Sequence, residues 1–220
     1  MKGKTATLIG ATGLIGSHLL ELLQNDDYYG RIKIVVRRPV SIKHPKIQLI
    51  IIDFSDEIAF RAAISGSDSV FCAVGTTNHK VKGDKEAYRK VDYDIPVNAA
   101  KFCSATGCPR FLLVSSVGAS SKSQNSYLKL KGEVEDRVRN INIPAVSVFR
   151  PSMLLGKRQE FRLGEAIAQT MMVPVSFLIP PIYRPIRAFD VAKSMVAASK
   201  NEIPGFHIYH YKEMKGILEV

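Results

Sequence analysis

The chain has 220 residues, enough to bury a full hydrophobic core, and its 46% hydrophobic and 23% charged residues are ordinary for a globular protein. Lysine and arginine exceed aspartate and glutamate by 31 − 20 = 11. These basic residues are scattered along the chain, and no aromatic-rich basic groove, recognition helix or zinc pattern accompanies them, so we expect no nucleic-acid partner.

Targeting and redox features are few. The opening residues, MKGKTATLIG, lack the long apolar core of a signal peptide, and the most apolar stretch, MMVPVSFLIPPI at 171–182, is too short and proline-broken to span a bilayer. Cys72, Cys103 and Cys108 are odd in number and lack CxxC spacing, which predicts neither a disulfide framework nor a metal site. We therefore expect a cytoplasmic protein without a bound metal.

Six short apolar runs predict the buried strands of a parallel sheet that is covered on both faces. They are TATLI at 5–9, IKIVV at 32–36, IQLIII at 47–52, SVFCAV at 69–74, FLLVS at 111–115 and AVSVF at 145–149.

Helical patterns separate these runs, and the third is interrupted by Pro96, which should kink or break it. The patterns cover 13–24, 56–64, 85–107 and 126–139. Alternation of strands and helices predicts an α/β fold, a Rossmann-type doubly wound parallel sheet with helices on both faces.

The regular alternation fades after residue 150. We expect a single domain of residues 1–220, with a core at 1–150 and residues 151–220 forming mostly a small lobe over the carboxyl edge of the sheet. That lobe would include the helix-like FDVAKSMVAASK at 189–200 and the strand-like FHIYHY at 206–211. In folds of this kind, ligands bind at the carboxyl edge, so the lobe would supply the substrate contacts.

A glycine-rich turn, LIGATGLIG, joins the first predicted strand to the first predicted helix. Glycines permit the tight turn and a close backbone approach, and the N–H groups at the helix N-terminus can bind a pyrophosphate. The alternative is that the glycines serve only the turn. In this strand–turn–helix context we predict a dinucleotide site formed by Gly10, Ala11, Thr12, Gly13, Leu14, Ile15 and Gly16.

Two arginines, Arg37 and Arg38, follow the second predicted strand, where an NAD-selective site usually carries an acidic residue. Guanidinium groups suit the 2′-phosphate of NADP, because they form charge-assisted and bidentate hydrogen bonds with phosphate. We therefore expect NADP(H) in preference to NAD(H); the alternative is that the arginines only face solvent.

Further cofactor contacts are expected where the third and fourth strands end. Asp53, followed by Phe54, either accepts a hydrogen bond from the adenine amino group or caps the helix that SDEIAF begins. Gly75 would let the backbone run close to the cofactor, and Thr76 either bonds to it or shapes the loop.

The pattern Tyr-x-x-x-Lys occurs three times, at Tyr29/Lys33, Tyr127/Lys131 and Tyr211/Lys215, and is too loose to be informative alone. The first pair straddles a turn and a strand start, and the third lies near the C-terminus. Only the second lies on a predicted helix that follows a strand ending in Ser115 and Ser116.

These serines, Tyr127 and Lys131 have the chemistry of a carbonyl-reducing site. A serine hydroxyl can orient a substrate carbonyl while the tyrosine phenol transfers a proton at its oxygen. An ammonium one helical turn away favours the phenolate form and can also reach the nicotinamide ribose. The alternative is an ordinary surface pair on an exposed helix face.

The turn GATGLIG, the strand end LVSS, the Tyr127/Lys131 pair and FRPSMLLG resemble the atypical or extended short-chain dehydrogenase/reductase superfamily. More narrowly, SSVGASSKSQNSYLKLKGEVE and FRPSMLLGKRQEFRLGE resemble its Tat-interacting-protein (oxidoreductase-like) branch, which is related to the NmrA-like proteins. This resemblance implies a Rossmann fold, NADP binding and a Ser-Tyr-Lys reductase site in which Ser116 is the serine. It also implies that Pro151, Ser152 and Met153 line the nicotinamide pocket.

One position departs from the family pattern. Many relatives carry an asparagine in the middle helix that completes a proton relay, whereas this chain has Asp92 there and Asn98 six residues later. A charged aspartate would alter such a relay.

The sequence thus predicts an NADP-dependent oxidoreductase that acts on a carbonyl or alcohol through Tyr127. The alternative is an NADP(H)-sensing regulator that binds a protein partner without significant turnover. The substrate, the oligomeric state and the direction of the reaction stay open.

Overall fold

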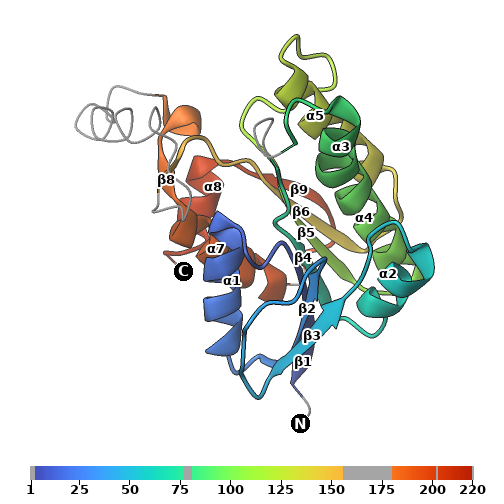
Figure 1. Cartoon of the computed structure of the whole chain (residues 1–220). Coiled ribbons are helices and arrows are strands. Elements are labelled where there is room, and N and C mark those ends of the chain that lie inside the picture. Colours follow the sequence, from blue (N-terminus) through green and yellow to red (C-terminus); the bar gives the residue numbers. More distant parts are fainter. Residues whose placement is uncertain (1–2, 77–80, 156–179, 202, 220) are drawn as a thin grey trace.

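The computed structural model describes residues 3–76, 81–155, 180–201 and 203–219, and a seven-stranded parallel sheet forms its centre (Figure 1). The strands lie in the order β3-β2-β1-β4-β5-β6-β9, and every pairing is parallel. Their bounds are β1 (Lys4–Ile9), β2 (Tyr29–Val36), β3 (Ile47–Ile51), β4 (Ser69–Cys72), β5 (Arg110–Val114), β6 (Ala145–Phe149) and β9 (Gly205–Tyr209). The order of the first six strands is that of a Rossmann fold, as the sequence predicted.

Helices cover both faces of this sheet (Figure 1). They are α1 (Leu14–Gln24), α2 (Glu57–Ile64), α3 (Lys85–Arg89), the π-helical turn η1 (Lys90–Asp94), α4 (Ile95–Ala105), α5 (Ser126–Arg139), α7 (Ala188–Lys200) and α8 (Tyr211–Gly216). One apolar cluster joins the sheet to α1 and α7, and a second joins it to α2, α4 and α5. This arrangement explains why the strands are apolar on both faces. Among the described residues, no helix combines the length and the apolar character needed to cross a membrane.

The C-terminal part of the chain differs from the predicted lobe. β9 is the seventh strand of the main sheet and pairs with β6, for example Val148 with Ile208. Helix α7 packs against α1 through fully buried Ala192 and Met195. Placing both elements in a lobe was wrong, because their apolar side chains complete the edge and one face of the core.

Outside the main sheet, β7 (Leu154–Leu155) and β8 (Ile186–Arg187) form a short parallel pair, and η3 (Pro181–Tyr183) is a single 3₁₀ turn. The segment 156–179, which includes most of the apolar stretch noted in the sequence, lies outside the described residues.

The predicted long helix at 85–107 is divided into α3, η1 and α4. Pro96 lies in the first turn of α4, directly after the π-helical turn, so the interruption that its missing N–H predicts falls where η1 passes into α4. The π-helical turn that precedes it brings Asp92 into the interior, where its relative exposure is 1%.

Candidate active site

The glycine turn is packed so tightly that side chains are excluded at two positions. Gly10 has φ +93°, and a Cβ added to it would lie 2.7 Å from the carbonyl carbon of Ala73, just beyond β4. A Cβ on Gly16 would lie 1.9 Å from the carbonyl oxygen of Gly10. The turn therefore lies between the ends of β1 and β4, the point where the strand order reverses and where dinucleotides bind in such sheets.

The N-terminus of α1 is free to receive an anion. Gly13 is its N-cap in an extended conformation, and no described side chain caps the helix or places an acid in its first turn. Free N–H groups and the positive end of the helix dipole are the features that favour a phosphate.

Arg37 and Arg38 directly follow β2 and are both exposed, on the same edge of the sheet as the glycine turn. The structure thus leaves both guanidinium groups accessible to a ligand at this edge.

The Asp53 carboxylate is exposed and accepts a hydrogen bond from the backbone of Ser55 at 2.9 Å, which holds the pKa of Asp53 below its ordinary value. Asp53 does not cap the next helix; Asp56 does, by accepting from the Ala59 N–H at 3.0 Å. Phe54 packs edge-on against Phe60, with ring centroids 4.8 Å apart. The structure thus contradicts the capping role foreseen for Asp53, and its contact with the adenine amino group stays a prediction.

Tyr127 lies in the first turn of α5, and its side chain is partly exposed, with a relative exposure of 40%. Asn125 caps this helix by accepting hydrogen bonds from the Tyr127 and Leu128 N–H groups at 3.0 and 3.1 Å. Lys131 follows one turn later and is buried, with its Nζ 6.0 Å from the centre of the Tyr127 ring. The two side chains share one face of α5, as their spacing predicted.

Lys131 forms a buried ion pair with Asp92, whose Oδ1 lies 3.0 Å from the Lys131 Nζ. The other carboxylate oxygen of Asp92 accepts from the N–H of Thr76, 2.7 Å away in the loop after β4. Burial lowers the pKa of Lys131, but Asp92 and Tyr127 outweigh it, so that the pKa lies above the ordinary lysine value. Lys131 is therefore held as an ammonium group.

The two serines after β5 have different surroundings. The Ser115 hydroxyl is buried and donates to Glu135, which also binds the guanidinium of Arg150, with its Oε2 2.5 Å from an Arg150 terminal nitrogen. The Ser116 hydroxyl is half-buried and makes one weak contact, to the Val117 carbonyl at 3.3 Å. Ser115 is thus bound within the fold, whereas Ser116 has the hydroxyl better able to turn toward a ligand.

Residues 151–153 connect β6 to β7 and bind neighbouring loops. The carbonyl of Pro151 accepts from the Val117 N–H at 2.9 Å, which ties this segment to the loop after Ser116. The Ser152 hydroxyl donates to the carbonyl of Arg184, and the Met153 carbonyl accepts from Ile186 at 3.0 Å. A cofactor contact from Ser152 would therefore compete with a hydrogen bond already made.

The other two Tyr-x-x-x-Lys matches have structural roles. Tyr29 and Lys33 both lie in β2, which begins earlier than predicted; the Tyr29 hydroxyl bonds to Ser199, and Lys33 donates to the Ser65 carbonyl. Tyr211 and Lys215 are both on α8, but Lys215 pairs with Asp190 at 2.7 Å.

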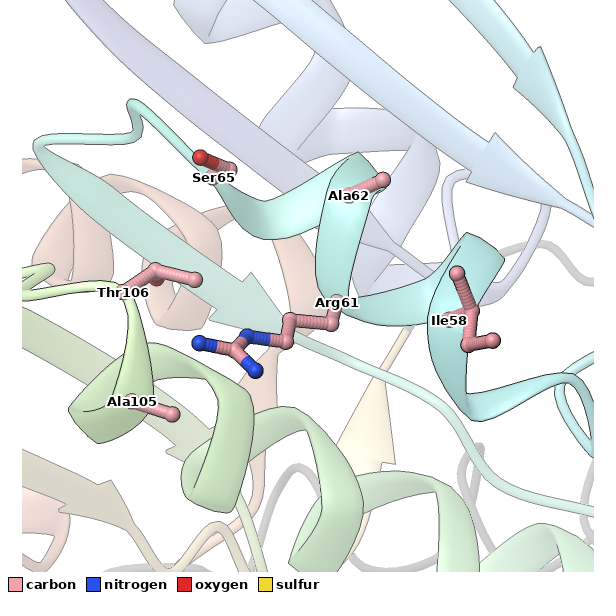
Figure 2. A pocket seen from close by; sticks show the side chains of 6 residues that line it. All are labelled: Ile58, Arg61, Ala62, Ser65, Ala105 and Thr106. Atoms are coloured by element: carbon pink, nitrogen blue, oxygen red, sulfur yellow. The ribbon is translucent and has the colours of Figure 1, made fainter.

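A surface depression of about 490 Å³ lies elsewhere, between α2 and the C-terminal end of α4 (Figure 2). Because that end of α4 leads into the start of β5, the depression lies toward the opposite edge of the sheet from the glycine turn. Its lining residues are Ile58, Arg61, Ala62, Ser65, Ala105 and Thr106. None of the predicted site residues lines this depression.

The sequence reasoning missed three residues that support the candidate site: Glu135, Arg150 and Gly132. A Cβ on Gly132 would lie 2.1 Å from the Ser120 carbonyl carbon, so this glycine lets the preceding loop pack on α5. Glu135 had a readable signal, because it follows Lys131 by four residues and so shares its helix face. No sequence signal pointed to Arg150, because its pairing with Glu135 is set only by the packing of α5 on the sheet.

The chain is similar to known proteins over most of its length. A family model described as NAD(P)H-binding matches residues 10–170. Protein HTATIP2 of Rattus norvegicus is 34% identical over 172 residues, covering 77% of this chain and 70% of the relative. The mitochondrial protein FMP52 of Candida albicans is 33% identical over 205 residues, covering 90% of this chain and 89% of the relative.

The fold has solved counterparts as well. The UDP-N-acetylglucosamine 4-epimerase from Methanobrevibacter ruminantium superposes with a TM-score of 0.72 at 18% identity, covering 96% of this chain and 77% of the epimerase.

The comparisons contradict one expectation and establish the family. The predicted cytoplasmic location is contradicted, because several FMP52 relatives are named as mitochondrial. The family match covers most of the chain, and the fold is shared with a solved epimerase and a solved uronate dehydrogenase. The chain belongs to the NAD(P)H-binding family and has a Rossmann-type fold that it shares with a solved epimerase, with HTATIP2 and FMP52 proteins among its relatives.

Proposed function

We propose that this protein is an NADP-dependent oxidoreductase that reduces a carbonyl group or oxidises the corresponding alcohol. The observation that carries the proposal is the arrangement on α5, where partly exposed Tyr127 stands one turn before the buried ammonium of Lys131. A phenol that is accessible to a ligand and backed by a fixed positive charge is suited to proton transfer.

The cofactor would be held by residues at the carboxyl edge of the sheet. The pyrophosphate would bind the glycine turn and the α1 N-terminus, and Arg37 and Arg38 would bind the 2′-phosphate. Further contacts would come from Asp53 and Phe54, from Gly75 and Thr76, from Ser115, and from the segment Pro151, Ser152 and Met153. When bound, the nicotinamide supplies or accepts the hydride.

The residues of this chain then perform the proton chemistry. In the reductive direction the Tyr127 hydroxyl donates its proton to the substrate oxygen, and in the oxidative direction its phenolate accepts that proton. The Ser116 hydroxyl donates a hydrogen bond to the same oxygen and orients it. The Lys131 ammonium stabilises the phenolate and donates to the ribose hydroxyls of the cofactor.

The direct test is NADPH oxidation by the wild-type protein across a panel of aldehydes and ketones, combined with NADPH binding followed by its fluorescence. Binding together with turnover of at least one carbonyl class supports the proposal. Binding without turnover across the panel contradicts it. A nucleotide-dependent protein partner would then favour the alternative, an NADP(H) sensor.

Cofactor preference gives a separate prediction. In an Arg37→Ala/Arg38→Ala variant we expect NADPH affinity to fall by about 100-fold or more, because two charge-assisted hydrogen bonds to phosphate are lost and each contributes about 1.5–3 kcal/mol. NADH affinity should stay near that of the wild type, because NADH lacks the 2′-phosphate.

Arg31→Ala is the matched control, because Arg31 is an exposed arginine near the start of β2, at the opposite end of the strand from Arg37 and Arg38. Isothermal titration of each variant with NADPH and NADH measures the preference. Equal losses for both nucleotides would mean that the two arginines do not read the 2′-phosphate.

A further inference from the structure

Asp92 is a buried carboxylate whose two oxygens serve two different parts of the site. Its Oδ1 pairs with the Nζ of Lys131 on α5 at 3.0 Å, and its Oδ2 accepts from the N–H of Thr76 at 2.7 Å. A Cβ on Gly75 would lie 3.6 Å from Oδ1, so the loop after β4 runs directly along the carboxylate. Asp92 thus joins the loop after β4 to the helix that carries Tyr127.

The demands on this residue are specific to a carboxylate. Lys131 is buried and Thr76 is half-buried, and each presents a donor that one oxygen of Asp92 accepts. An asparagine of the same shape has one acceptor oxygen and an NH₂ group, which would face one of the two donors. The pairing therefore depends on acceptor number and charge rather than on side-chain size.

We propose that Asp92 is a positioning residue that holds Lys131 as a charged donor and ties it to the loop after β4. These two contacts hold helix α5 and the loop after β4 in a fixed position relative to each other. This inference deepens the proposed function, because it rests on Lys131 contacting the bound cofactor. The π-helical turn that carries Asp92 is consistent with such a role, since these turns occur frequently at functional sites.

In the part of the chain that the structure describes, three titratable groups face the Lys131 ammonium: Asp92 from η1, Tyr127 from its own helix and Cys72 from the end of β4. Burial alone lowers the pKa of Lys131, and Asp92 is the main group that raises it. Cys72 supplies no anion near neutrality, because burial raises the pKa of its thiol to about 12. Without the Asp92 charge, Lys131 should therefore lose its proton at a lower pH.

The first test is NADPH affinity of an Asp92→Asn variant, measured by fluorescence between about pH 7 and about pH 9. Wild-type affinity should be nearly constant over this range. The affinity of the variant should fall about tenfold or more as pH rises, because a buried lysine without a counter-ion can titrate in this range. The matched control is Asp94→Asn, which removes the same charge from the same π-helical turn. An Asp92→Asn profile parallel to that of the control would overturn the proposal.

A second test serves if Asp92→Asn does not fold. In a Lys131→Met variant, folding buries the Asp92 carboxylate without its cation, so the midpoint of thermal unfolding should fall well below that of the wild type. Adding Asp92→Asn to Lys131→Met removes the unpaired charge and should restore part of that loss. A double variant that is no more stable than Lys131→Met would contradict the proposal.

Neither the NADPH affinity nor the stability measurement requires turnover. If both give the expected result but the wild-type protein reduces no carbonyl, only the proposed reaction is contradicted. If the wild-type protein is active but neither measurement gives the expected result, only the role of Asp92 is contradicted.

Discussion

Replacing Tyr127 with phenylalanine is expected to lower turnover by about 10²- to 10⁴-fold, the usual contribution of a positioned general acid or base. The substitution removes the phenolic oxygen and leaves the ring that faces Lys131 in place. Because the side chain is partly exposed, no buried partner among the described residues loses a hydrogen bond, and the free energy of unfolding should change by less than about 0.5 kcal/mol. NADPH affinity should stay near the wild-type value.

The matched control for this prediction is Tyr211→Phe. Tyr211 also precedes a lysine by four residues on a helix, but Lys215 is engaged with Asp190. Steady-state kinetics with the best carbonyl from the panel should therefore show a loss for Tyr127→Phe alone. Wild-type turnover in Tyr127→Phe would show that another group moves the proton.

Replacing Gly16 with alanine is expected to abolish most NADPH binding, with a loss of about 100-fold or more. The new Cβ would lie 1.9 Å from the carbonyl oxygen of Gly10 and 3.1 Å from the Cα of Ala11. Both are backbone atoms, so either the turn or the start of α1 must move. Such a shift removes N–H groups from the pyrophosphate, and each charged hydrogen bond lost costs about 1.5–3 kcal/mol. Overpacking should also lower the free energy of unfolding by about 1–3 kcal/mol.

Gly216→Ala on α8 is the control, because a Cβ there would meet no atom within 4 Å. It should bind NADPH as the wild type does and melt at the same temperature or slightly higher, since alanine favours helix. Titration with NADPH and thermal unfolding of both variants give the comparison. Undiminished NADPH affinity in Gly16→Ala would rule out the α1 N-terminus as the pyrophosphate site.

Local sequence patterns determined the core elements of this protein. Strands such as 145–149 were readable because a strand buried on both faces is almost wholly apolar. The shared helix face of Tyr127 and Lys131 follows from the helical repeat, and the tight turn at 10–16 follows from the spacing of its glycines. Each of these features depends on residues only a few positions apart, so no knowledge of the tertiary structure was needed.

The tertiary structure alone decided which distant segments meet. The partner of Lys131 is Asp92, and that of Glu135 is Arg150, because packing of η1 and the end of β6 against α5 brings these charges together. Packing also placed β9 beside β6 and α7 against α1, where the sequence suggested a separate lobe. Contacts of this kind depend on how faces of elements fit together, and no short-range spacing encodes them. The sequence therefore identified the tyrosine and the lysine, and the fold supplied the buried carboxylate that keeps the lysine charged.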